Sequence, residues 1–345
     1  MSGTAQTRGP VELAPGRCVT AHMPMSDCMA CVLACPHDAL DTAGAGLALD
    51  PARCTGCGQC TAACPQGALS LAPALPSPIR ARAGQVALIA CARAAHAPAH
   101  AAPCAQALGL DDLARLWLDG VRVLALATGD CGTCPEATPA GRDGLAERID
   151  LLDALLATRG RPPLHARVAP PALIRRLALP QDHADDTARR AALGLPRHST
   201  ADTAAGLGPA GALRRLQDLP PAPGQAALFA AAPRIAPAHC TGCDACARIC
   251  PEGALILVKD SNSTMRYDID APACTGCGLC EEICDEDAVD VQRPAGTVSR
   301  VTLFPYTCRS CRAQMHHPSA RFAAKGLCPA CHRSARHRQP VLVLE

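Results

Sequence analysis

The chain has 345 residues, 24 of them cysteine, and its formal net charge is only +2. So small a charge argues against a protein that binds nucleic acid or an anionic membrane by bulk electrostatics. Aromatic residues make up 2% of the chain, with Trp117 the single tryptophan, so one large hydrophobic core is not expected. Several small domains, each stabilised by metal, fit this composition better.

The cysteine content also indicates a cellular compartment. No secretory or twin-arginine signal is recognisable at the start of the sequence, and no apolar stretch approaches the length of a membrane span. In a reducing cell interior, thiols serve as metal ligands and not as disulfides. We therefore expect a cytoplasmic, metal-binding protein with neither a membrane nor a nucleic acid as partner.

Residues 1–17 carry Gly, Pro and Thr without periodicity and are predicted to be a loose leader. A first cysteine-rich module follows over residues 18–72. Its regular run, C-x2-C-x2-C-x3-C-P, consists of Cys54, Cys57, Cys60, Cys64 and Pro65. An imperfect copy upstream consists of Cys28, Cys31, Cys35 and Pro36.

The imperfect copy has Met25 where its first cysteine is expected. A thioether is a weak ligand beside thiolates, so another group should complete this site. Cys18 could reach the open position through a longer loop, and we favour this residue. The alternatives are a three-iron cluster, or His22 or Asp27 as the missing ligand.

Residues 84–160 change character and predict a small α/β domain. Apolar runs at 86–90 and 121–126 are typical of strands, and leucine spacing predicts helices over 108–118 and 145–156.

This middle domain contains Cys91, Cys104, Cys131 and Cys134. Three interpretations remain open for these thiols. They could hold a [2Fe-2S] cluster, or Cys131 and Cys134 could form a dithiol switch after a strand. The third interpretation is a structural zinc site or inert buried thiols.

Residues 161–235 are predicted to be a helical, Pro- and Arg-rich linker, with short helices near 172–179 and 185–193. Its arginines, Arg214 and Arg215 among them, form either a solvated face or a docking surface for an acidic redox partner.

A second cysteine-rich module is predicted over residues 236–292. Its first run is Cys240, Cys243, Cys246 and Cys250 with Pro251, and its second is Cys274, Cys277, Cys280 and Cys284. A tight loop with a thiolate every third residue can reach three corners of a cubane cluster, while the cysteine four residues on reaches a second cluster. Zinc sites usually combine two C-x2-C pairs, which explains these runs poorly.

The tail, residues 300–345, pairs Cys308 and Cys311 with Cys328 and Cys331. Two C-x2-C pairs at this separation predict a zinc-ribbon-like tetrahedral site, with a single iron, as in rubredoxin, as the alternative. His316, His317, His332 and His337 are predicted to be surface imidazoles or replacement ligands.

Both modules resemble bacterial two-[4Fe-4S] ferredoxins, in which the fourth cysteine of each run binds the cluster of the other run. For the second module, this resemblance implies one site of Cys240, Cys243, Cys246 and Cys284, and another of Cys274, Cys277, Cys280 and Cys250. For the first module, it implies one site of Cys54, Cys57, Cys60 and Cys35, and another of Cys28, Cys31, Cys64 and the added Cys18.

The corner Gly129-Asp130-Cys131 of the middle domain is similar to that of the delta subunit of methyl-viologen-reducing hydrogenases and of heterodisulfide-reductase relatives. The family has an additional cysteine where this chain has Thr128. This resemblance implies a [2Fe-2S] cluster and a partner enzyme of that kind.

We therefore expect an α+β multidomain protein with four [4Fe-4S] sites, one of which could be [3Fe-4S]. No Gly-rich dinucleotide or phosphate-binding motif is visible, so we lean away from an enzyme with substrate chemistry of its own. The expected function is to relay low-potential electrons as an accessory subunit of a molybdopterin- or flavin-dependent oxidoreductase, such as a formate dehydrogenase, or of a hydrogenase or heterodisulfide-reductase-type complex. The alternative is a metalloenzyme assembly or redox-sensing adaptor that uses the Arg-rich linker and zinc tail.

Overall fold

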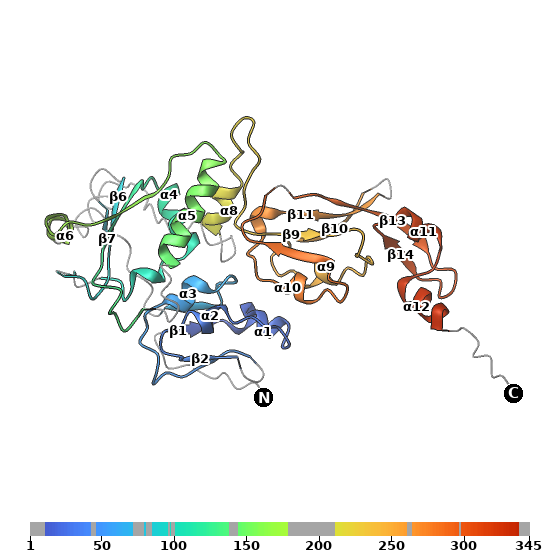
Figure 1. The fold of residues 1–345 in the computed structure, drawn as a ribbon, viewed down its shortest axis with the longest axis horizontal. Helices are drawn as coiled ribbons and strands as arrows, with labels where there is room; N and C mark the ends of the chain where they lie inside the picture. The colour runs from blue at the N-terminus through green and yellow to red at the C-terminus, as the bar shows by residue number, and fades with distance from the viewer. Residues whose placement is uncertain are drawn as a thin grey trace, which may run out of the picture. The chain divides into compact units, whose positions relative to one another are not determined.

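The computed structural model describes residues 11–42, 46–71, 79–80, 85–95, 97, 101–137, 144–178, 211–260, 264–296 and 298–337. The chain divides into two compact units, Met1–Leu228 and Phe229–Glu345. Each unit mixes short helices with small sheets (Figure 1). None of the described helices is long and apolar enough to cross a membrane.

The first cysteine-rich module lies at the start of the first unit. Its elements are β1 (Val11–Leu13), η1 (Pro15–Arg17), α1 (Val19–His22), α2 (Ala30–Leu33), β2 (Leu40–Asp41), β3 (Ala48–Leu49), α3 (Gln59–Ala63) and β4 (Leu69–Leu71). Two antiparallel pairs, β1 with β4 and β2 with β3, flank the short helices that follow the cysteine loops. The apolar side chains of these strands pack around Cys31 and Cys60.

The prediction of a loose leader over 1–17 is wrong for its described part, residues 11–17. Val11 pairs with Leu71 across β1 and β4, and its side chain is 1% exposed. The strand is only three residues long, too short for hydrophobic periodicity to reveal it. Residues 1–10 lie outside the described residues.

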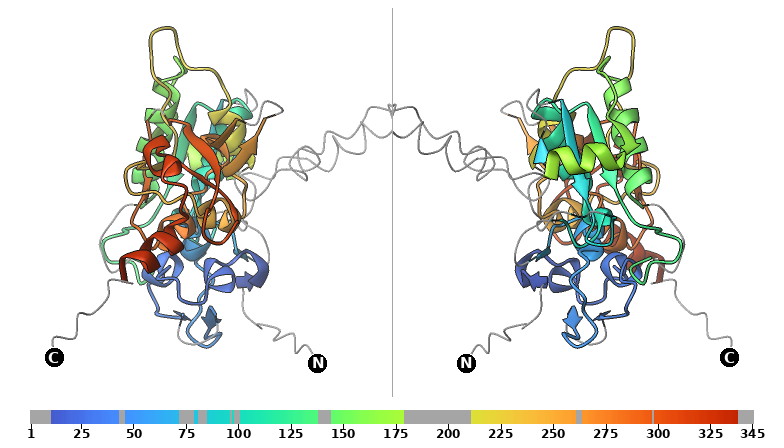
Figure 2. Two further views of the ribbon diagram at one scale, coloured as in Figure 1. Left: turned by 90° about the vertical axis from the view of Figure 1, so that its right-hand side faces the viewer. Right: turned by 90° about the vertical axis from the view of Figure 1, so that its left-hand side faces the viewer.

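The middle domain is built on a four-stranded sheet in the order β5-β6-β7-β8 (Figure 1). Its strands are β5 (Ile79–Arg80), β6 (Val86–Ala90), β7 (Val123–Ala127) and β8 (His165–Val168), with η2 (Ala105–Ala107) and the helices α4 (Leu110–Leu118) and α5 (Gly144–Ala157) between them. Strands β6, β7 and β8 run parallel. In the right-hand view of Figure 2 these strands, coloured cyan to green, lie side by side.

The predicted strands and helices of this domain agree with the observed ones to within about two residues. Leu88 and Leu124 of the sheet and Leu152 and Leu156 of helix α5 are at most 1% exposed, so both the sheet and the helix bury leucine side chains. Continuous apolar strands of this kind are typical of a parallel sheet, because helices cover it.

The prediction that a linker begins at residue 161 is wrong, because β8 pairs with β7 and belongs to the sheet. All four residues of β8 are exposed, so no apolar pattern announced this strand. Two helices follow in the described residues, α6 (Pro171–Ala178) and α8 (Gly211–Gln217). The backbone of Leu213 in α8 donates to Asp111 of α4 at 2.8 Å, which ties α8 to the domain. The helix predicted near 185–193 lies outside the described residues.

The second unit combines the second cysteine-rich module and the tail. Its elements are β9 (Ala232–Ile235), α9 (Ala245–Ile249), β10 (Leu255–Lys259), β11 (Met265–Ile269), η3 (Ala271–Ala273), α10 (Leu279–Glu282), β12 (Val289–Gln292), β13 (Val301–Thr307), β14 (Gln314–His317), α11 (Ala320–Ala324) and α12 (Pro329–His337). Strand β9 pairs with β12, and a four-stranded sheet has the order β10-β11-β13-β14.

The predicted boundary at residue 300 implied that the tail is a separate domain, and this prediction is wrong. Strand β13 pairs antiparallel with β11, so the tail continues the sheet of the second module (Figure 1). Val301 and Leu303 of β13 are buried, with Leu303 2% exposed, and pack with Tyr267 of β11. The hydrophobic core of the module therefore extends into the tail.

A buried arginine holds the end of the middle domain together. Arg159, 4% exposed, donates from its guanidinium to the carbonyl oxygens of Leu155, Gln217, Leu219 and Leu228 at 2.8–3.2 Å. Burial lowers the pKa of this arginine. One side chain thus satisfies carbonyl groups from the ends of α5 and α8 and from the segment that follows α8.

We predict that Arg159→Ala lowers the free energy of unfolding of the first unit by about 3 kcal/mol, because several buried carbonyls lose their donor. Urea denaturation monitored by the fluorescence of Trp117, which lies in α4 of the same domain, measures the change. Arg161→Ala, two residues away at an exposed position, is the matched control. Equal stability of the two variants would contradict the prediction.

Candidate metal centres

In the second module, the cysteines of the two runs are interleaved. Burial and, after it, repulsion from Cys240, Cys243 and Cys284 raise the pKa of Cys246 to about 12. The pKa of Cys240 is raised by burial and by the same neighbour, Cys284. The fourth cysteine of the second run thus lies beside the first run.

The reciprocal arrangement holds for the other run. Burial raises the pKa of Cys274 to about 11, with repulsion from Cys277 and Cys250 as further causes. The pKa of Cys280 is raised by burial and then by repulsion from Cys274, Cys277 and Cys250. Each run therefore supplies three thiols to one site and its fourth thiol to the other.

The first module repeats this interleaving. Burial raises the pKa of Cys60 to about 12, and its charged neighbours include Cys57, Cys35 and Cys54. A small cavity is lined by these same four cysteines. This geometry brings together the four residues that the ferredoxin resemblance groups in one site.

At the irregular site, Cys18 lies near the thiols of the imperfect run. Burial and, after it, repulsion from Cys64, Cys28 and Cys18 raise the pKa of Cys31 to about 12. Met25 points away into solvent and is 90% exposed. Cys18 stands just before α1, where its thiol lies 3.1 Å from the hydroxyl of Thr20.

Backbone N–H groups point at the fourth cysteine of several runs. Ala39 donates to the Sγ of Cys35, Ala68 to that of Cys64 and Ala288 to that of Cys284, at 3.2–3.3 Å. Each alanine follows its cysteine by four residues, so the turn after the cysteine supplies the donor. Hydrogen bonds to sulfur tune the reduction potential of iron–sulfur clusters.

The four cysteines of the middle domain line one cavity of about 740 Å³. It lies at the carboxyl ends of the parallel strands, where ligands bind in α/β sheets. Cys91 directly follows β6, and the corner Gly129-Asp130-Cys131 follows β7. A side chain at Gly129 would approach the carbonyl oxygen of Arg93 to 2.8 Å, so the corner requires glycine.

Hydrogen bonds fix the loop that carries two of these thiols. Asp130 accepts from the backbone of Gly132 and from the hydroxyl of Thr133, both at 3.0 Å. Burial and, after it, repulsion from Cys57, Cys91 and Cys134 raise the pKa of Cys104, which lines the same cavity, to about 12. Since Cys57 belongs to the first module, the two groups of cysteines are neighbours.

Glu136 joins this cavity to the first module. Its Oε2 lies 2.8 Å from Nε2 of His37 and accepts from the hydroxyl of Thr55 at 3.0 Å. Its carbonyl oxygen accepts from the side chain of Gln59 at 2.6 Å. The Glu136 side chain is 11% exposed, and Arg93 approaches its other carboxylate oxygen at 3.8 Å. The loop of Cys131 and Cys134 is thus fastened to the loop of Cys54, Cys57 and Cys60.

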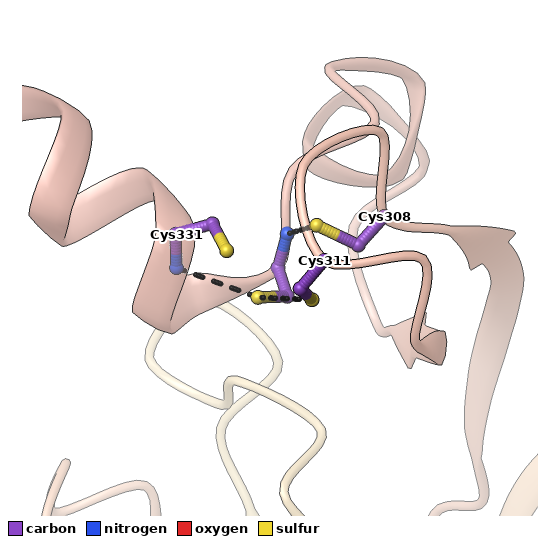
Figure 3. A group of neighbouring side chains, drawn as sticks. Cys308, Cys311 and Cys331 are labelled. Atoms are coloured by element: carbon purple, nitrogen blue, oxygen red, sulfur yellow. Dashed lines mark hydrogen bonds between the residues drawn. The ribbon is translucent and has the colours of Figure 1, made fainter.

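The tail brings Cys308, Cys311, Cys328 and Cys331 together, with all four Sγ atoms within 4.8 Å of one another. Figure 3 shows the three labelled thiols converging from the turn after β13 and from the start of α12. The Sγ atoms of Cys311 and Cys328 are 3.8 Å apart. Tetrahedral zinc with Zn–S bonds of about 2.3 Å separates its sulfurs by about this distance. Among the described residues, no other group of this kind forms.

Hydrogen bonds prepare this site for a cation. The backbone N–H groups of Cys311 and Cys328 lower the pKa of Cys308 to about 6, which makes it a thiolate at neutral pH. The N–H of Cys328 lies 3.3 Å from the Sγ of Cys308, and that of Cys331 lies 3.4 Å from the Sγ of Cys328. The donor set therefore fits a metal that prefers thiolate ligands.

Of the two predicted roles for His316 and His317, surface imidazoles or replacement ligands, the first is wrong, since the two residues are 9% and 7% exposed. Nε2 of His316 lies 2.7 Å from Oδ1 of Asp244, which also accepts from the hydroxyl of Tyr267 at 2.7 Å. His317 stacks on Phe322. Cysteine spacing contains no signal for the contact between Asp244 and His316, because 72 residues separate the two positions.

Comparison with known families agrees with the two cysteine-rich modules. Residues 25–68 and 239–288 each match the model of the 4Fe-4S dicluster domain. A search of the curated proteins gave no match. The chain is therefore a protein with two ferredoxin-like dicluster regions, and these support an iron–sulfur electron-transfer role. The first match begins at Met25, so Cys18 lies outside it.

We predict that Cys18→Ser alters one site of the first module, because an alcohol replaces a thiolate beside Cys28, Cys31 and Cys64. The altered site should lose about one iron and give the EPR signal of an oxidised three-iron cluster. Met25→Ala, at the exposed position where the motif expects a cysteine, is the control. If Cys18→Ser left iron content and EPR spectrum unchanged, Cys18 would not be a ligand.

We predict that Glu136→Ala loosens the middle domain from the first module and lowers the free energy of unfolding by about 1–3 kcal/mol. Glu136→Gln keeps an acceptor oxygen and should retain much of that stability. Glu147→Ala, at an exposed position of α5, is the control. Urea denaturation monitored through Trp117 compares the variants, and equal stability of the Glu136 and Glu147 alanine variants would contradict the prediction.

Proposed function

We propose that the chain relays low-potential electrons between redox enzymes through four [4Fe-4S] sites. The observation that supports this most is the interleaving of the cysteine runs in both modules. In both modules the fourth cysteine of one run lies beside the cysteines of the other run, which supports two neighbouring sites of four thiols each. When bound, such clusters accept and donate single electrons. The protein supplies thiolates, N–H donors to sulfur and an apolar cover.

The proposed ligands follow this interleaving. In the first module, they are Cys35, Cys54, Cys57 and Cys60 at one site and Cys18, Cys28, Cys31 and Cys64 at the other. In the second module, they are Cys240, Cys243, Cys246 and Cys284 at one site and Cys250, Cys274, Cys277 and Cys280 at the other. Cys18 takes the place of the residue at position 25, whose side chain lies in solvent.

The cavity of the middle domain is proposed to hold a [2Fe-2S] cluster on Cys91, Cys104, Cys131 and Cys134. All four thiols line one cavity beside Cys57, and the Glu136 contacts hold the cavity against the first module. A dithiol made of Cys131 and Cys134 alone would leave Cys91 and Cys104, which line the same cavity, without a role. The donor set is therefore better suited to a four-thiolate group.

The tail is proposed to hold structural zinc, for which its four converging thiols are suited. As to partners, the resemblance of the middle domain favours a hydrogenase, a heterodisulfide-reductase-type enzyme or a formate dehydrogenase in the cytoplasm, with this chain as an accessory subunit. That step rests on analogy between domains.

Metal analysis tests the proposal. Anaerobically purified protein should contain about 18 irons, matching sulfide and one zinc per chain, or about 16 irons if the middle cavity holds no cluster. The variant Cys131→Ser/Cys134→Ser should lose only the two irons of the middle cavity. About 8 irons with several zincs would contradict the relay and favour a zinc-stabilised adaptor. Clusters transferred to an apo-enzyme instead of being reversibly reduced would favour an assembly protein.

A further inference from the structure

One contact between the tail and the second module reaches a cysteine loop directly. Asp244 lies between Cys243 and Cys246, and its side chain meets His316 of β14 at 2.7 Å. Both side chains are 11% exposed. The ring of Tyr267 packs edge-to-face against His316, and its hydroxyl donates to the same oxygen of Asp244. This loop therefore rests on a buried polar network that includes the tail.

The backbone of β14 also packs against the loop. Gly242 has φ +71°, and a side chain at this position would clash with the carbonyl oxygen of His316. Two constraints thus select glycine here, the left-handed backbone and the close approach of the tail. The contact is backbone packing as well as a single hydrogen bond.

A second part of the tail reaches the fourth cysteine of the same site. Arg333 of α12 donates to Glu286, two residues after Cys284, at 2.9 Å. This ion pair is solvent-exposed, so it contributes little energy. It nevertheless places α12 beside the turn of Cys284, while β14 lies over the loop of Cys240, Cys243 and Cys246. Both contacts converge on the same proposed cluster site.

The positions of β14 and α12 depend on the four thiols of the tail. Cys308 and Cys311 lie in the turn that leads from β13 into β14, and Cys328 and Cys331 lie at the start of α12. Short elements with few buried apolar residues usually need a metal to fold. A metal at this site would hold both contacting elements.

We propose that the zinc-bound tail holds the ligand loop of the site of Cys240, Cys243, Cys246 and Cys284 in place, with His316 as the residue that positions this loop. This inference rests on the proposed function, since it requires a cluster at that site. Cys243 of this loop is exposed, so the tail acts by limiting movement of the loop and not by closing the site to solvent, and it leaves the other three clusters unaffected. Loss of zinc therefore makes a single cluster labile.

The test uses the full chain, reconstituted anaerobically, and follows iron release to a ferrous chelator after exposure to air. In His316→Ala and in Cys328→Ser, about 4 of the [4Fe-4S] irons should be released at least about tenfold faster than in the wild type. Only Cys328→Ser should also lack zinc. His316→Gln can still donate a hydrogen bond to Asp244 and should therefore restore slow release. If His316 only filled space, a hydrogen-bond donor at this position would not be needed for slow release. Arg321→Ala, an exposed arginine of α11, is the control.

Wild-type release rates in both His316→Ala and Cys328→Ser would overturn the inference while leaving the relay intact. If Cys328→Ser released all its iron because it misfolds, the result for His316→Ala would decide whether the inference holds. This variant keeps all four tail cysteines. Fast release confined to about 4 irons would support the inference, and wild-type release would overturn it. Failure of the proposed function is distinguishable, because wild-type protein would then lack the irons of the second module before any exposure to air.

Discussion

The rest of this structure depends on thiol groups held close together inside the protein. Burial raises the pKa of several cysteines of the two ferredoxin-like modules, to about 12 for Cys31, Cys60 and Cys246. Without a cation these three thiols stay protonated, and bonds to a metal replace their protons. With 2% aromatic residues, the chain has little other means of building cores in its small domains. The apolar clusters that do form include the cysteines themselves, as Cys240, Cys246 and Cys280 show.

The parts outside the ferredoxin-like modules are attached to them in two different ways. The middle domain contacts the first module through polar groups, with Glu136 as the common acceptor. The tail continues a sheet of the second module through β13 and shares its hydrophobic core. In both cases the contact reaches a cysteine loop rather than a distant surface. Each attached part can therefore influence the groups bound at that loop.

Much of this arrangement could be predicted from sequence, because metal-binding thiols follow fixed spacings. The runs at 54–64, 240–250 and 274–284 indicated their modules, and apolar runs indicated β6 and β7. Three features had no such signal. Strand β1 is too short, the residues of β8 are all exposed, and the contact of His316 with Asp244 joins positions far apart in the chain. Cys18 was inferred only because Met25 is a poor ligand. The structure gives this inference physical support by placing Cys18 near Cys31 and Met25 in solvent.

The contact of the tail with the second module and that of the middle domain with the first module share one more property. Each includes a carboxylate with little exposure to solvent, Asp244 in the first case and Glu136 in the second. Burial alone would raise the pKa of Asp244, but hydrogen bonds from His316 and Tyr267 hold it below its usual value, so the group stays ionised. Burial raises the pKa of Cys57, and the charge of Glu136 adds to that rise. A fixed negative charge beside a cluster opposes the arrival of an electron and lowers the reduction potential, by about 40 mV for each kcal/mol of repulsion. Arg248 and Arg93 approach these carboxylates only at 3.6 and 3.8 Å and are largely exposed. Solvent therefore screens their positive charges, which offset little of the negative charge of Asp244 and Glu136. The residues that fasten the added parts therefore also favour low potentials at the loops they hold.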